Sequence, residues 1–178
     1  MQNRYATSQI LLHWLTLLLL IIVYATMEFR GLASHGSWQR SLMVVTHFSA
    51  GTTVLLIILL RLWLRTRHRT PAIVPPLRLW MTAASHLLHT CLYGLFILLP
   101  VLGISSRYLK GKEWMLFGIN MPVSTSPLPE LAASLTDWHE TLAPVGYWLV
   151  GIHALAALSH HYLFRDNTLL RMMPFRQK

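Results

Sequence analysis

Residues 139–153 read HETLAPVGYWLVGIH, and the two histidines that close this stretch decide how the chain is interpreted. Only one charged residue, Glu140, lies between them. In a helix, the fourteen-residue spacing of His139 and His153 returns almost to the same face and separates the rings by about 21 Å along the axis. Two imidazoles spaced in this way can hold two haems, one above the other.

The rest of the chain is typical of a membrane protein. Of its 178 residues, 54% are apolar and 12% are charged, whereas soluble domains carry roughly 25% charged residues. Four stretches contain no Asp, Glu, Lys or Arg: 5–27, 41–60, 79–106 and 141–164. Each is long enough to cross the hydrocarbon core, where the backbone must satisfy its own hydrogen bonds in a helix. The sequence predicts an all-α, integral membrane four-helix bundle, a single domain over residues 1–178, with spans near 8–27, 41–62, 80–105 and 141–163.

The basic residues predict the orientation. Ten of the fifteen fall on one side: Arg4, Arg61, Arg65, Arg67, Arg69, Arg78, Arg165, Arg171, Arg176 and Lys178. Because cytoplasmic segments carry an excess of Lys and Arg, both termini are expected to be cytoplasmic. The run from Arg61 to Arg69 is interpreted as an anchor at the lipid head groups. A shorter uncharged stretch, 114–129, is rich in Gly and Pro and is expected to form an interfacial loop.

Histidine inside a membrane span is costly and by default marks a functional site. In the predicted topology, His13 and His153 share the inner level, whereas His47 and His139 share the outer level. Each level therefore has one imidazole from each of two helices, as a six-coordinate haem iron requires. Because imidazoles would fill both axial positions of the iron, such a site favours electron transfer over oxygen activation.

Other histidines are alternatives or accessories. His86 and His89, three residues apart on the third predicted helix, are the rivals of His13 as a ligand. His160 and His161 are expected near the cytoplasmic end, where they could contact haem propionates or a quinone head group.

Small residues and one proline bear on the same sites. Gly51 and Gly146 lie in register with the histidines and are expected to leave room for the porphyrins. Pro144 either marks the effective start of the fourth helix or kinks it. A histidine-lined metal transporter without haem is a remote alternative, because no Asp or Glu lies inside any predicted span.

The segment DWHETLAPVGYWLVGIHALAALSHHYLFRDNTLLRMMP (137–174) resembles the bacterial cytochrome b561 family. Shorter matches are LHW around His13, MEFRG at 27–31 and THFSAG around His47. The resemblance implies a multi-pass protein of the bacterial inner membrane with two b haems. It assigns His13 and His153 to the iron of the cytoplasmic-side haem, and His47 and His139 to the iron of the periplasmic-side haem.

Members of this family pass electrons between a donor and the quinone pool, and the chain looks most like those that oxidise superoxide and reduce ubiquinone. Arg107, Lys110 and Lys112, with Arg30, would form a positive entrance for a small anion, which nearby acidic residues partly cancel. No other catalytic residue is predicted. The alternative is a cytochrome b anchor subunit that relays electrons for a periplasmic dehydrogenase or hydrogenase.

Overall fold

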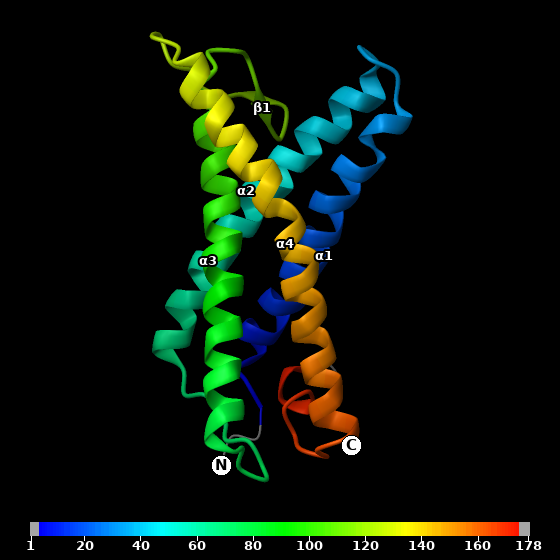
Figure 1. Ribbon diagram of the computed structural model, residues 1–178, viewed down its shortest axis with the longest axis vertical. Helices are drawn as coiled ribbons and strands as arrows, with labels where there is room; N and C mark the ends of the chain where they lie inside the picture. Colours follow the sequence, from blue (N-terminus) through cyan, green and yellow to red (C-terminus); the bar gives the residue numbers. More distant parts are fainter. Residues whose placement is uncertain (1–3, 175–178) are drawn as a thin grey trace.

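The structure is a computed structural model that describes residues 4–174, and it is almost entirely helical (Figure 1). Arg176 and Lys178, counted above among the inner-side charges, lie outside the described residues. The main elements are α1 (Thr7–Glu28), α2 (Trp38–Arg67), α3 (Leu79–Leu109) and α4 (Pro129–Tyr162). Each contains a segment long and apolar enough to cross a membrane. The predicted all-α membrane bundle of four helices is confirmed.

The helices continue beyond the predicted spans. The largest extension is at α4, which begins at Pro129, whereas the predicted span begins at residue 141. Charged residues are excluded from the hydrocarbon core but not from a helix, so the charge-free stretch marks only part of α4. Pro129 and Glu130 suit the first turn, where a missing amide and a negative charge are both tolerated. Pro144 lies inside α4, so the interpretation that the helix starts near it is wrong.

The bundle consists of two closely packed helix pairs. α1 packs along α2, and α3 packs along α4, with a smaller contact between α2 and α3. α1 and α4 approach each other less closely, and the cavity between the pairs is lined by residues of all four helices. The buried apolar cluster lies near the middle of the bundle: Leu20, Val54, Ile58, Leu95, Phe96 and Leu99.

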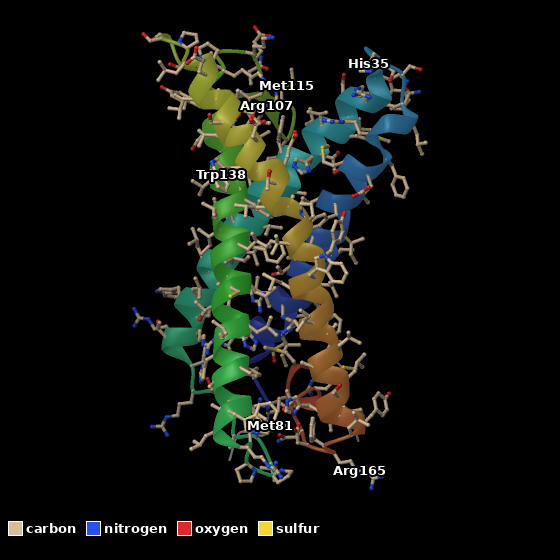
Figure 2. All side chains as sticks on the ribbon, viewed as in Figure 1. His35, Met81, Arg107, Met115, Trp138 and Arg165 are labelled. Carbon is tan, nitrogen blue, oxygen red and sulfur yellow. The ribbon has the colours of Figure 1, made fainter. Side chains whose placement is uncertain are left out.

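The two ends of the bundle differ. Both described chain ends lie at the same end, called the inner end here (Figure 1). Figure 2 shows Met81 and Arg165 at this end, and His35, Arg107 and Met115 at the opposite, outer end. The shared end of the two termini agrees with an even number of spans.

The segment 114–129 forms no membrane-spanning helix, as predicted. It contains a short antiparallel hairpin of β1 (Met115–Leu116) and β2 (Ile119–Asn120) at the outer end (Figure 1). Phe117 and Gly118 both have positive φ, as a tight two-residue hairpin turn requires. The Phe117 amide donates to the Ser49 hydroxyl on α2 at 2.8 Å, which ties the hairpin to the bundle.

The segment after α4 folds back beneath the inner end. The Tyr5 amide donates to the Arg171 carbonyl at 3.2 Å, and the Trp14 indole N–H donates to the Met172 carbonyl at 2.8 Å. The guanidinium of Arg171 is buried and donates to the Pro71 carbonyl. These bonds join the two chain ends and the α2–α3 connection into one cap.

Candidate haem sites

The outer pair of histidines joins α2 to α4. The ring centres of His47 and His139 are 6.1 Å apart. The Nδ1–H of His47 donates to the Val23 carbonyl at 3.0 Å, and the Nδ1–H of His139 donates to the Leu99 carbonyl at 2.8 Å. With the proton on Nδ1, each neutral ring keeps a free lone pair on Nε2 for a metal.

This spacing fits two imidazoles on opposite sides of one metal ion. A ligating nitrogen lies about 2 Å from the metal and the ring centre about 1 Å farther, so opposed rings have centres about 6 Å apart. The donor set also fits, because imidazole is an axial ligand of haem iron. The outer pair therefore meets the requirements of a bis-histidine haem site.

A cavity of about 410 Å³ surrounds the outer pair. Its lining includes the basic side chains Arg30, Arg107 and Lys110, whereas Lys112 does not line it. The guanidinium of Arg107 lies 4.9 Å from the centre of the Phe48 ring. Gly51 also lines the cavity, and no atom lies within 4 Å of the position that a Cβ would take there, so the expected room at this glycine is present.

The expectation for Gly146 is wrong. A Cβ at Gly146 would overlap the Tyr24 hydroxyl and would lie 3.4 Å from Phe96 Cε1. Tyr24 reaches across from α1 and donates to the Ala143 carbonyl at 2.7 Å. Gly146 therefore makes room for an aromatic side chain from the same protein.

The inner pair joins α1 to α4. The ring centres of His13 and His153 are also 6.1 Å apart. Both predicted pairs thus connect the two helix pairs across the space between them, and α4 supplies one imidazole to each level. The structure brings together the residues that the sequence grouped.

His89 also approaches His153, at 5.2 Å between ring centres. This distance is shorter than opposed ligands require, and α3 and α4 pack directly against each other, which leaves little space for a porphyrin between these rings. The Nδ1–H of His89 donates to the Ser85 carbonyl at 2.6 Å. His86 is exposed. The spacing of the rings favours His13 over both rivals, although His89 shares with the outer histidines the tautomer that leaves Nε2 free.

Arg61 does not lie where the sequence placed it. Its guanidinium is half-buried and turned into the bundle, where Nη2 donates to His13 Nδ1 at 3.0 Å and Nη1 donates to the Thr16 hydroxyl at 3.2 Å. Arg65 and Arg67 are exposed, as an anchor at the lipid head groups requires. The head-group interpretation is therefore wrong for Arg61.

At the inner end of α4, His160 forms a hydrogen bond that the sequence did not reveal. Its Nδ1 lies 2.5 Å from Oδ2 of the buried Asp166. Burial of Asp166 opposes ionisation, but contacts with Thr168 and His160 outweigh it and hold the pKa of this carboxyl below its usual value. His161, the other quinone candidate, is half-buried, with its ring 4.8 Å from that of Tyr162.

Comparison with known proteins decides the family. The family described as prokaryotic cytochrome b561 matches residues 4–175. The chain belongs to this family. It is 45% identical over 175 residues to cytochrome b561 homolog 1 of Escherichia coli (strain K12), covering 98% of this chain and 99% of that protein. It is 42% identical over 176 residues to the probable superoxide oxidase CybB of Yersinia pestis, covering 98% of each.

Family membership and the four apolar helices define the class of protein. The chain is a b-type cytochrome, a multi-pass protein of the bacterial inner membrane that transfers electrons across it. Its environment is lipid, and its partners are redox partners. A metal transporter without haem is set aside, because the family is one of cytochromes.

Proposed function

We propose that the protein holds two b haems, with His47 and His139 as the outer axial ligands and His13 and His153 as the inner ones. The observation that carries this proposal is the equal 6.1 Å spacing of two imidazole pairs at two levels of the bundle. Each bound haem would supply one reversible one-electron step of its iron. We also propose that both termini lie on the cytoplasmic side, because the basic residues gather at the inner end; the outer level would then face the periplasm.

The protein's own groups orient the ligands and exclude water. The carbonyls of Val23 and Leu99 fix the outer imidazoles in the tautomer that leaves Nε2 free. Tyr24 and Phe96 pack against Gly146, halfway along α4 between its two histidines. They fill the region between the two levels with protein, which insulates the electron path from water.

We further propose superoxide as the periplasmic electron donor. The name of the Yersinia pestis relative supports this choice. The outer cavity is lined by three basic side chains, Arg30, Arg107 and Lys110, which favour the approach of a small anion and outnumber the two acidic ones, Glu28 and Glu140. Each superoxide would lose one electron and leave as dioxygen, and Lys112 would act only through its longer-range field.

Ubiquinone is the proposed acceptor at the inner end. Two electrons from two superoxide ions, with two protons, would convert ubiquinone to ubiquinol. His160 is suited to deliver protons, because Asp166 holds its Nδ1 at 2.5 Å and leaves the other ring nitrogen available. His161 is a second candidate on the same turn.

Two measurements on the purified protein test the proposal. A pyridine haemochrome assay should give two b haems per chain. Rapid mixing with superoxide should reduce the cytochrome, and ubiquinone should reoxidise it. A haem content near one per chain would overturn the two-level assignment, and a cytochrome that superoxide leaves oxidised would exclude this donor.

A further inference from the structure

Arg61 lies on α2 close to the helix face that carries His47. It follows His47 by fourteen residues, the same interval that separates His139 from His153 on α4. α2 therefore carries an imidazole at the outer level and a guanidinium at the inner level, close to one face of the helix. The contacts of Arg61 with His13 and Thr16 confirm that this guanidinium lies between α2 and α1 at the inner level.

The charge of Arg61 has no carboxylate partner within residues 4–174, where the one carboxylate in contact with a basic side chain is Asp166, beside His160. The groups that face it are the His13 ring nitrogen, the Thr16 hydroxyl and the Tyr93 ring, whose centre is 5.9 Å from Cζ. None of these carries a negative charge. A guanidinium inside a membrane span is costly unless an anion compensates it, so this position calls for an anionic ligand.

Iron binding at His13 would increase the need of Arg61 for an anionic partner. A neutral imidazole that ligates iron through Nε2 carries its proton on Nδ1, and two donors cannot share a hydrogen bond. The guanidinium of Arg61 must then find another acceptor. A haem b held by His13 and His153 would carry two propionate carboxylates, and planar guanidinium groups such as that of Arg61 bind carboxylates with two parallel hydrogen bonds.

We propose that Arg61 binds a propionate carboxylate of the inner haem and raises the midpoint potential of that haem. The inference rests on the proposed function, because it assumes a haem on His13 and His153. A positive charge near the iron in a medium of low dielectric constant favours the reduced form, which carries one positive charge fewer. Arg61 would thereby favour electron flow from the outer level to the inner one.

Potentiometric titration of the purified cytochrome tests the effect on the potential. R61Q should lower one of the two midpoint potentials, or lose one haem, while the other haem is unchanged. R61K keeps the charge and should retain both haems with a smaller shift. R65Q removes an exposed, solvent-screened charge one turn farther along α2 and is the matched control, with a much smaller shift expected than in R61Q.

Infrared difference spectroscopy tests the carboxylate contact itself. Growth on 5-aminolevulinate labelled with carbon-13 at its carboxyl places the label in the haem propionates. The labelled carboxylate bands in oxidised-minus-reduced spectra should shift in R61K, because a point charge replaces the two-pronged contact, and should stay constant in R65Q. This comparison does not depend on R61Q being stable enough to purify.

Failure of the inference about Arg61 and failure of the proposed function would give different results. Two haems with unchanged potentials in R61Q, or unchanged propionate bands in R61K, would overturn the inference and leave the haem assignment intact. A wild-type protein with fewer than two haems would instead overturn the proposed function.

Discussion

At the scale of single residues, Tyr24 and Gly146 form a close contact between α1 and the middle of α4. The phenol lies over the glycine and donates to the Ala143 carbonyl at 2.7 Å. Only a residue without a side chain permits this contact. The pair therefore limits how closely α1 and α4, the helices that carry the proposed inner ligands, can approach each other.

Gly146→Ala is expected to destabilise the protein, because the new Cβ would overlap the Tyr24 hydroxyl and displace it from Ala143. Overpacking of this kind costs about 1–3 kcal/mol. The measurement is the thermal unfolding midpoint in detergent. Gly151→Ala is the matched control, since no atom lies within 4 Å of its added Cβ. Equal midpoints for the two variants would contradict the prediction.

The ligand assignment gives a second prediction at this scale. His153→Ala and His13→Ala should each lose the inner haem, and His47→Ala should lose the outer one, because each removes an axial ligand. Haem per chain, measured as the pyridine haemochrome, should fall from two to about one. The exposed His86 provides the control, and His86→Ala should keep both. If His89→Ala loses a haem while His13→Ala retains both, His89 is the ligand instead.

The four proposed ligands could be grouped from the sequence because helical register and topology alone bring them to two levels. Tyr24, Arg61 and Asp166 could not be assigned in the same way. Their roles depend on which side chain crosses the gap between helices and on how the chain turns after α4. A sequence pattern does not specify either feature.

At the scale of helices, Ser106 makes a polar link between α3 and α4. Its buried hydroxyl donates to the Ala132 carbonyl at 2.9 Å and lies 2.6 Å from the Thr136 hydroxyl. Near the same level, Gly103 lets His139 approach α3, where a Cβ would lie 3.4 Å from the imidazole. The outer ligand is thus held against α3 by small residues on that helix.

Ser106→Ala should lower stability by about 1 kcal/mol, because it removes this link and leaves the half-buried Thr136 hydroxyl with one partner fewer. The free energy of unfolding in detergent and denaturant measures the change. Ser105→Ala, one residue earlier on the same helix, is the control and should be nearly neutral. A Ser106→Ala variant as stable as this control would show that the link contributes nothing.

The existence and class of the four helices were predictable, since charge-free stretches of this length have one solution in lipid. Their ends were not, because helices continue into the interface where charges are tolerated. The β1–β2 hairpin was expected only as a loop. Its form depends on the positive φ of Phe117, which residue type does not predict.

At the scale of the whole molecule, the distribution of charge separates the two ends. The basic residues Arg30, Arg107 and Lys110 border the outer cavity, whereas the inner end carries the larger group of arginines. The outer group acts on solutes in the periplasm if the proposed orientation holds. Neutralising basic residues at the outer end tests whether their charge attracts superoxide.

Replacing Arg107, Lys110 and Lys112 together with Gln should slow reduction by superoxide and weaken its dependence on ionic strength, because attraction of the anion is reduced. Stopped-flow rates at several salt concentrations provide the measurement. A variant with Arg65, Arg67 and Arg69 replaced by Gln removes equal charge from the inner end and should keep the wild-type rate. Equal rates and salt slopes in both triple variants would exclude an electrostatic entrance.

The inner cap gives a prediction about pH. The pKa of Asp166 is lowered in the folded protein, so its ionised form contributes stability that is present above the unfolded value of about 4. This stability is lost as the pH falls through the lowered folded pKa. Asp166→Asn should therefore unfold at a lower temperature than wild type near neutral pH, as measured by circular dichroism. The difference between the two proteins should shrink below about pH 4. A constant difference would show that ionisation of Asp166 is not involved.

Val23 and Leu99 orient the outer imidazoles with oxygens that belong to the peptide chain and not to a side chain. No replacement at either position can delete such an acceptor. Substitutions at Val23 and Leu99 therefore change the size and shape of the side chain but keep the backbone acceptor that sets the tautomer of each ring. Release of the rings would require a shift of the helix backbone, so the orientation of these two proposed ligands tolerates side-chain substitution at Val23 and Leu99.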